Sequence, residues 1–320
     1  MAVESAISNR SSPLRLALRA VPLGTRLLPR LPERTTQRAL GRILGRWPAL
    51  WGLSDDGEYV RSTRQAFRLA FPAENADRFV QSWLAARANA LAVSIGYMAR
   101  WMIGRESRMV RLQPRFRLQG TGPFVVVFLH YSLEPVIQLA CLTAHPNLSF
   151  RWPIYPLQPN IEDDRVLWLT RSELPPTAAR TLLSIADPKW TVDVLAHLRR
   201  GGSLLMALDA PLDGRRPASA TIAVGELRVP IAPSVEIFVR ASGAKLVFAS
   251  PRREPDGTWT LDLVHVSDIE ELAAQAAEWI LTYREEWAGW PYVVWREDAV
   301  EMRRTIMVSS LPGDRTARAS

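Results

Sequence analysis

Apolar positions recur with two different periods along the chain, and the period changes after about residue 115. Before that point they follow helical spacing, with one helix predicted over residues 55–71 and a longer one after Glu74. After Pro123, short β-branched and aromatic runs alternate with helical segments. This pattern predicts an α/β fold, in which a helical N-terminal section precedes a mixed, mostly parallel sheet flanked by helices. The predicted parts are a basic helical section (1–115), an α/β core (116–308) and a flexible tail (309–320).

Individual elements of the predicted core are identified from apolar runs and from the glycine and proline residues that end them. Residues 124–129 are apolar throughout, which is typical of a strand covered on both faces. A helix is predicted next over 133–143, with Pro135 tolerated in its first turn. The remaining predictions are helices over 191–200, 234–242 and 268–286, strands over 203–208, 244–250 and 258–266, and paired strands within 221–231 that turn near Gly225.

Composition narrows the classes of function. With 320 residues, 48% of them hydrophobic, the chain can bury a sizeable core. Its single cysteine, Cys141, excludes an internal disulfide and a cysteine-based zinc site. Of the four histidines, His145, His197 and His265 have no second histidine or carboxylate at metal-ligand spacing, so no metal is predicted. His197 is predicted to lie on the surface of its helix.

The net charge of +8 is concentrated near the N-terminus, where residues 1–50 hold nine arginines against Glu4 and Glu33. Leucines and tryptophans interleave with these arginines, which favours contact with a membrane surface over nucleic acid. The alternative is a helical arm packed on the domain with its arginines solvated. No segment is predicted to cross a membrane, because arginines interrupt the best candidate, 85–104. No signal peptide is visible either. We therefore expect a cytoplasmic protein, free or peripherally attached.

His130 lies at a position in the sequence that is typical of a catalytic residue. It follows the buried strand and opens the next helix, where α/β folds place their ligand sites. Glu134 lies four residues later, and the two side chains share a face if the helix begins near His130. Its carboxylate can keep one imidazole nitrogen protonated and leave the other to accept a proton. Such a pair has no nucleophile of its own, so it suits a substrate hydroxyl or amine that attacks an acyl thioester. The alternative for Glu134 is a structural role at the helix start.

Several blocks, in order, resemble one known family. Leu129-His-Tyr-Ser-Leu-Glu-Pro135 resembles the His–acid block of the lysophospholipid acyltransferase superfamily, and the chain resembles its lipid A biosynthesis (lauroyl and myristoyl transferase) branch. The resemblance extends collinearly over about residues 40–300. Its other blocks are Tyr59-Val-Arg-Ser-Thr-Arg-Gln-Ala-Phe-Arg-Leu-Ala-Phe-Pro72, Leu198-Arg-Arg-Gly-Gly-Ser-Leu-Leu-Met-Ala-Leu-Asp209, Gly214-Arg-Arg216 and Val224-Gly225.

The resemblance implies an acyltransferase at the cytoplasmic face of the inner membrane. The acyl group would pass from acyl carrier protein or coenzyme A to a hydroxyl or amine of a lipid or glycolipid, with no further cofactor and no nucleic acid partner. His130 would be the general base and Glu134 its orienting acid. Asp209 would shape the floor of the site or hold an arginine, unless it only caps a turn. By their chemistry, Arg215 and Arg216 are candidate phosphate contacts, with a solvated turn as the alternative, and Tyr131 and Ser132 are candidate donors to the oxyanion. Tyr155 is a further candidate substrate contact.

The chain departs from the family pattern at several of these positions. Three residues separate His130 from Glu134 where the family has four, and Tyr155 stands where the family has an arginine. Asp209-Ala210 replaces an Asp-Gln pair, and the arginine-rich segment replaces a hydrophobic anchor. Two alternatives therefore stay open. One is a relative that acylates a small-molecule acceptor, and the other is a membrane-associated relative without catalytic activity.

Overall fold

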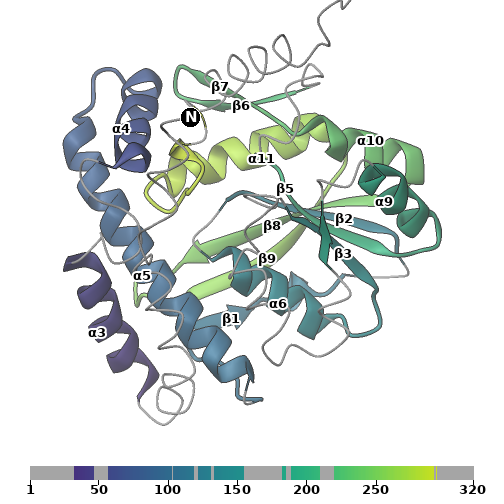
Figure 1. Cartoon of the computed structure of the whole chain (residues 1–320), viewed down its shortest axis with the longest axis horizontal. Coiled ribbons are helices and arrows are strands. Elements are labelled where there is room, and N and C mark those ends of the chain that lie inside the picture. The colour runs from purple at the N-terminus through teal and green to yellow at the C-terminus, as the bar shows by residue number, and fades with distance from the viewer. Residues whose placement is uncertain are drawn as a thin grey trace, which may run out of the picture.

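The computed structural model describes residues 32–46, 57–102, 104–118, 122–130, 133–154, 182–184, 189–209, 220–291 and 293. A central sheet is flanked by helices, and α3, α4 and α5 lie together along one side of the molecule (Figure 1). The helices are α3 (Glu33–Arg46), α4 (Glu58–Ala70), α5 (Ala76–Met102), η3 (Pro114–Phe116, a 3-10 helix), α6 (Glu134–Ala144), α9 (Trp190–Arg199), α10 (Pro233–Ser242) and α11 (Ile269–Thr282). The strands are β1 (Val110–Leu112), β2 (Phe124–Phe128), β3 (Phe150–Ile154), β4 (Leu182–Ser184), β5 (Ser203–Ala207), β6 (Thr221–Val224), β7 (Leu227–Pro230), β8 (Lys245–Arg253) and β9 (Trp259–Val266).

The sheet is mixed and mostly parallel, as predicted. Its strands pair in the order β1-β9-β8-β2-β5-β3-β4, and among these pairs only β8 and β9 run antiparallel. The hairpin β6–β7 pairs separately and turns at Gly225, whose φ of 57° favours glycine. The predicted fold class, a helical N-terminal section followed by a helix-flanked sheet, is confirmed.

The register at the centre of the sheet brings two distant segments to one edge. Every residue of β2 is fully buried, which explains its continuous apolar run. β2 runs parallel to β5, with Phe128 opposite Ala207. His130 and Asp209 each follow these paired residues by two positions. Parallel strands have their carboxyl ends at the same edge of the sheet, so His130 and Asp209 lie close together at that edge.

Helices α4 and α5 share one hydrophobic core with the sheet. Phe67 of α4 stacks on Phe79 of α5 with ring centroids 3.7 Å apart, and the edge of Trp290 packs against both rings. Aromatic rings contribute both large buried areas and preferred pair geometries. This packing fixes the helical section against the segment that follows α11, although it leaves the predicted boundary at 115/116 untested.

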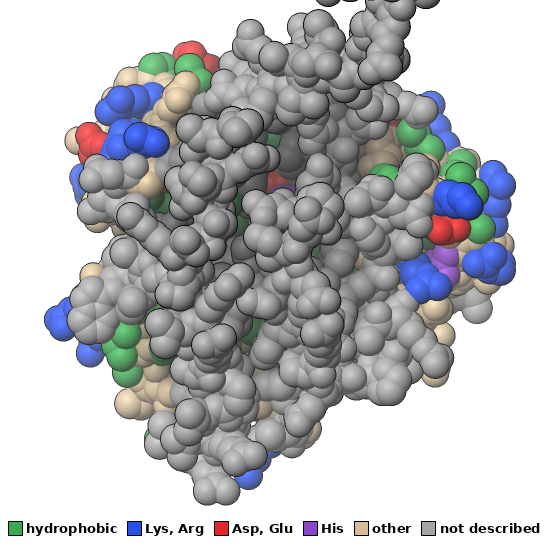
Figure 2. Space-filling model, viewed as in Figure 1, with side chains coloured by type: hydrophobic (Ala, Val, Ile, Leu, Met, Phe, Trp, Pro, Cys, Tyr) green, Lys and Arg blue, Asp and Glu red, His purple; other side chains and the backbone are tan. Residues whose placement is uncertain are grey.

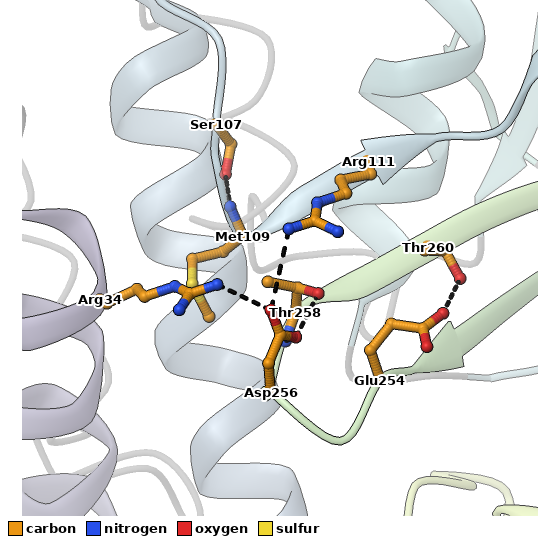
Figure 3. Close-up of polar contacts among 8 residues, drawn as sticks. All are labelled: Arg34, Ser107, Met109, Arg111, Glu254, Asp256, Thr258 and Thr260. Carbon is orange, nitrogen blue, oxygen red and sulfur yellow. Dashed lines mark hydrogen bonds and ion pairs between the residues drawn. The ribbon is translucent and has the colours of Figure 1, made fainter.

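Two carboxylates tie α3 to the rest of the chain. Buried Glu33 pairs with Arg100 of α5 and accepts a hydrogen bond of 2.7 Å from the backbone N–H of Arg108. Asp256, in the turn between β8 and β9, accepts a hydrogen bond of 2.7 Å from Arg34 of α3 and lies 3.7 Å from the guanidinium of Arg111 on β1 (Figure 3). The first turn of α3, through Glu33 and Arg34, therefore anchors this helix to α5 and to the turn between β8 and β9.

Some expectations for individual elements need correction. The helix predicted over 268–286 ends at Thr282, after Asp268 caps its start by accepting from the N–H of Glu271. His197 is buried rather than on the surface, and its Nε2 is satisfied by donating to the carbonyl of Ser149 over 2.8 Å. Strands β1, β3 and β4 were not predicted at all. In the described part of the chain, no helix is long and apolar enough to cross a membrane.

Candidate active site

A buried aspartate holds the imidazole of His130. Asp209 Oδ1 lies 2.8 Å from His130 Nδ1, and the same carboxylate accepts from the backbone N–H of His130 at 3.0 Å and 3.3 Å. The Asp209 side chain is 1% exposed and that of His130 is 21% exposed. Because a carboxylate only accepts hydrogen bonds, Nδ1 of the neutral imidazole carries the proton. Nε2 is then the nitrogen that can accept another one.

The segment after α11 completes the support of this pair. Trp287 Nε1 donates to Asp209 Oδ2 over 2.7 Å, and the backbone N–H of Ala288 donates to the carbonyl of His130 over 2.7 Å. Trp83 of α5 in turn donates to the carbonyl of Trp287 over 2.9 Å. A Cβ at Gly289 would lie 2.6 Å from Asp209 Oδ2 and still closer to the Trp287 ring. Glycine at 289 therefore permits the approach of this segment to Asp209.

Glu134 stands beside the pair, at the first residue of α6. Its Oε1 accepts from Gln138 Nε2 over 3.1 Å, and its charge acts on both His130 and Asp209. The structure thus brings together the predicted residues His130, Glu134 and Asp209. However, the carboxylate that accepts from a protonated imidazole nitrogen, the role predicted for Glu134, is that of Asp209, which accepts from Nδ1.

Electrostatics favour a charged His130. Burial lowers the pKa of His130, but the charge of Asp209, its hydrogen bond and the charge of Glu134 outweigh burial and raise this pKa to about 9, against some opposition from Arg87. Burial also raises the pKa of Asp209, yet the positive charge and hydrogen bonds of His130, together with the Trp287 N–H, lower it overall. For Glu134, burial raises the pKa and prevails over the attraction of His130. The site is thus built to stabilise an imidazolium.

Three other side chains of reactive types, His145, His197 and Cys141, are buried in structural positions. His145 is buried, its Nδ1 donates to the carbonyl of Cys141, and its Nε2 accepts from the N–H of Leu118, which fixes a neutral tautomer. Burial lowers the pKa of His145 and of His197. Burial raises the pKa of the Cys141 thiol to about 12, so this cysteine is not an activated nucleophile. Within the described ranges, no three His, Cys, Asp or Glu side chains form a group that could hold a metal ion.

The sequence did not predict a role for two residues of the site, and several of the contacts it did predict lie outside the described residues. Trp287 and Gly289 fell at or beyond the end of a predicted helix and received no role. The only signal was a dense Trp287-Ala-Gly-Trp-Pro291 run after an amphipathic segment. Outside the described residues lie the predicted contacts Tyr131, Ser132, Tyr155, Arg215 and Arg216.

Comparisons with known proteins add little to this geometry. No protein-family model matches the chain, and no curated protein matches it. The crystal structure of the 1-acyl-sn-glycerophosphate (LPA) acyltransferase, PlsC, from Thermotoga maritima aligns with 71% of this chain and 96% of its own. The sequence identity is 11% and the TM-score is 0.33. A likeness of this degree transfers neither fold nor activity.

Proposed function

We propose that this protein is an acyltransferase that moves an acyl group from a thioester to a hydroxyl or amine acceptor. One observation carries the proposal: buried Asp209 holds Nδ1 of a partly exposed His130 at 2.8 Å, at the carboxyl edge of a parallel sheet. This is a general base with its orienting acid. Cys141, the only cysteine, is buried and not activated, so a thiol nucleophile is absent from the chemistry.

The proposed reaction uses His130 as both base and acid. Its neutral Nε2 takes the proton of the acceptor hydroxyl or amine as that group attacks the thioester carbonyl carbon. The new C–O or C–N bond forms a tetrahedral intermediate, which collapses as the C–S bond breaks. The imidazolium then returns the proton to the departing thiolate, so that an ester or amide and a free thiol leave. Asp209 stabilises the imidazolium between the two transfers.

The finer assignments belong to the same proposal. The donor is a fatty acyl thioester of acyl carrier protein or coenzyme A, and the acceptor is a lipid or glycolipid at the cytoplasmic face of the inner membrane. Tyr131 and Ser132 contribute to the oxyanion site, while Tyr155, Arg215 and Arg216 contact the substrates. Glu134 contributes through its negative charge, which raises the pKa of His130. The family resemblance of the sequence supports these assignments.

Release of free thiol from long-chain acyl coenzyme A and acyl carrier protein tests the proposal. Wild type is compared with His130→Ala and with His265→Ala, which removes a histidine on β9 that lies outside the cluster. We expect thiol release by wild type and by His265→Ala, and a loss of about 10²–10⁴-fold in His130→Ala, the usual contribution of a positioned proton-transfer group. Equal rates for wild type and His130→Ala would reject the mechanism.

A further inference from the structure

The outer face of α4 carries a cluster of arginines that the proposed reaction does not use. Arg61, Arg64 and Arg68 occupy positions i, i+3 and i+7, which share one face of a helix. Lys and Arg side chains are visible over α4 at the upper left of Figure 2. An open surface cavity of about 440 Å³ adjoins this face, and its described lining is Arg61, Arg64, Gln65, Arg68 and Leu69. We call these five residues the α4 arginine site.

One carboxylate organises the site without neutralising it. Asp77 of α5 accepts a hydrogen bond of 2.6 Å from Nε of Arg64 and lies 3.9 Å from a terminal nitrogen of Arg68. Three guanidinium groups against one carboxylate leave a charge of +2 (3 − 1). Among the described residues, Arg61 has no ion-pair partner, and Arg64 uses only its Nε. Several N–H donors of the two side chains therefore remain available to a ligand.

The α4 arginine site stands on a rigid base. The inward side of α4 is fully buried at Val60 and Ala66, and Phe67 is locked between Phe79 and Trp290. The end of the helix is held as well, because the N–H of Glu226 donates to the carbonyl of Ala70 over 3.0 Å. A site on such an element loses little entropy when a ligand binds, because its backbone is already fixed.

We infer that the α4 arginine site binds the phosphate group of a phosphate ester. Guanidinium forks match the paired oxygens of phosphate, and the three non-bridging oxygens of a phosphate monoester can accept from more than one guanidinium. The cavity is much larger than inorganic phosphate, whose volume is of the order of a few water molecules. Leu69, 51% exposed at the rim, offers an apolar contact for the organic part of the ligand. The phosphate comes either from a phospholipid head group or from a soluble phosphate ester.

Binding measurements on the full chain separate these two sources. The variants are Arg61→Gln/Arg68→Gln, and a matched control, Arg199→Gln/Arg200→Gln, which removes two charges from exposed arginines near the end of α9. Co-sedimentation uses vesicles of phosphatidylglycerol and of phosphatidylcholine, and titration calorimetry uses glycerol phosphate. All are repeated in His130→Ala, which does not touch the site. Failure of the proposed reaction therefore leaves this test intact.

The binding results distinguish a lipid head group from a soluble phosphate ester. If phosphatidylglycerol vesicles bind wild type and the α4 variant loses tenfold or more while the α9 control does not, the source is a lipid head group. If glycerol phosphate binds wild type with the same loss pattern, the source is a soluble ester. Equal losses of binding in the α4 variant and the α9 control would show unspecific attraction between charges. No binding of either ligand by wild type would show that the site does not exist. Either result overturns the inference. Arg61→Lys/Arg68→Lys keeps the charge but loses the forks, so we expect intermediate binding and an unchanged melting temperature.

Discussion

Two aspartates, Asp209 and Asp256, use similar contacts in very different surroundings. Each accepts a backbone N–H and side-chain donors, and each joins segments far apart in sequence. Asp209 links His130 to Trp287, whereas Asp256 links Arg34 to the turn between β8 and β9. The side chain of Asp209 is 1% exposed and that of Asp256 is 41% exposed. Burial is thus the main difference between them.

Burial decides what such contacts can do. The pKa of Asp256 is lowered mainly by its hydrogen bonds with Thr258, and water screens the charges of Arg34 and Arg111. Around Asp209 there is little water to screen its charge. Burial lowers the pKa of His130, but this charge, the hydrogen bond from Nδ1 and the charge of Glu134 together raise the pKa to about 9. The exposed aspartate therefore ties surface segments together, whereas the buried one helps to raise the pKa of a neighbouring histidine.

The largest expected effect separates the two aspartates by activity. Asp209→Asn removes the charge that orients and stabilises His130, so we expect thiol release to fall by about 10²–10⁴-fold. Asp256→Asn should keep the rate within about twofold, because exposed pairs contribute little. Steady-state rates of both variants at saturating donor provide the measurement. Similar losses in the two variants would remove the distinction drawn from burial.

A second, smaller effect concerns the close approach at Gly289. Gly289→Ala places a methyl group against Asp209 and the Trp287 ring, and overpacking of this kind costs about 1–3 kcal/mol of stability. Gly45→Ala is the matched control on α3, where the new Cβ meets only Ala88 at 3.8 Å. There the helix should gain about 0.4–1 kcal/mol. Urea denaturation of both variants measures the change in the free energy of unfolding. If Gly289→Ala left this free energy unchanged, the segment after α11 would have to move easily away from Asp209.

The pH dependence sharpens the roles of the two carboxylates around His130. The base must be neutral, so the kcat/KM of wild type should rise with pH until about pH 9, the pKa of His130. Glu134→Gln removes a negative charge that raises this pKa, which should shift the rising limb to lower pH and preserve the plateau. A Glu134→Gln enzyme with an unshifted limb and a plateau lowered a hundredfold would instead identify Glu134 as the orienting acid.

The smallest expected effect is on stability at the surface. The pKa of Asp256 is lowered in the folded protein, so its contribution is present above the ordinary aspartate pKa near 4 and is lost as the pH falls through the folded pKa. At neutral pH, melting temperatures of wild type and Asp256→Asn should differ slightly at low salt and converge at 1 M salt. A difference that persists at high salt would show that the turn has a packing role beyond its ion pairs.

The sequence predicted the regular parts of the molecule well because local patterns determine them. The apolar run of β2 and the helical spacing of α4 and α5 identified these elements, with errors of a few residues at their ends. The edge strands β1 and β4 are three residues long and have no comparable pattern. The partnership of His130 with Asp209 depends on the parallel register of β2 and β5, which no local spacing reveals. Glu134 was preferred because it was near in sequence, and the same limit concealed Trp287.

The contacts of Trp287 and Ala288 set an order for events during protein synthesis. His130, Asp209 and the strands that carry them emerge from the ribosome long before residue 287, so a nascent chain holds the imidazole with its outer supports missing. Strand β1 likewise waits for β9, its partner in the sheet. His130 therefore acquires its full set of supports only after residues 287 and 288 have been synthesised. A nascent chain that stops before residue 287 lacks the hydrogen bonds to Asp209 and to the carbonyl of His130 that these two residues supply.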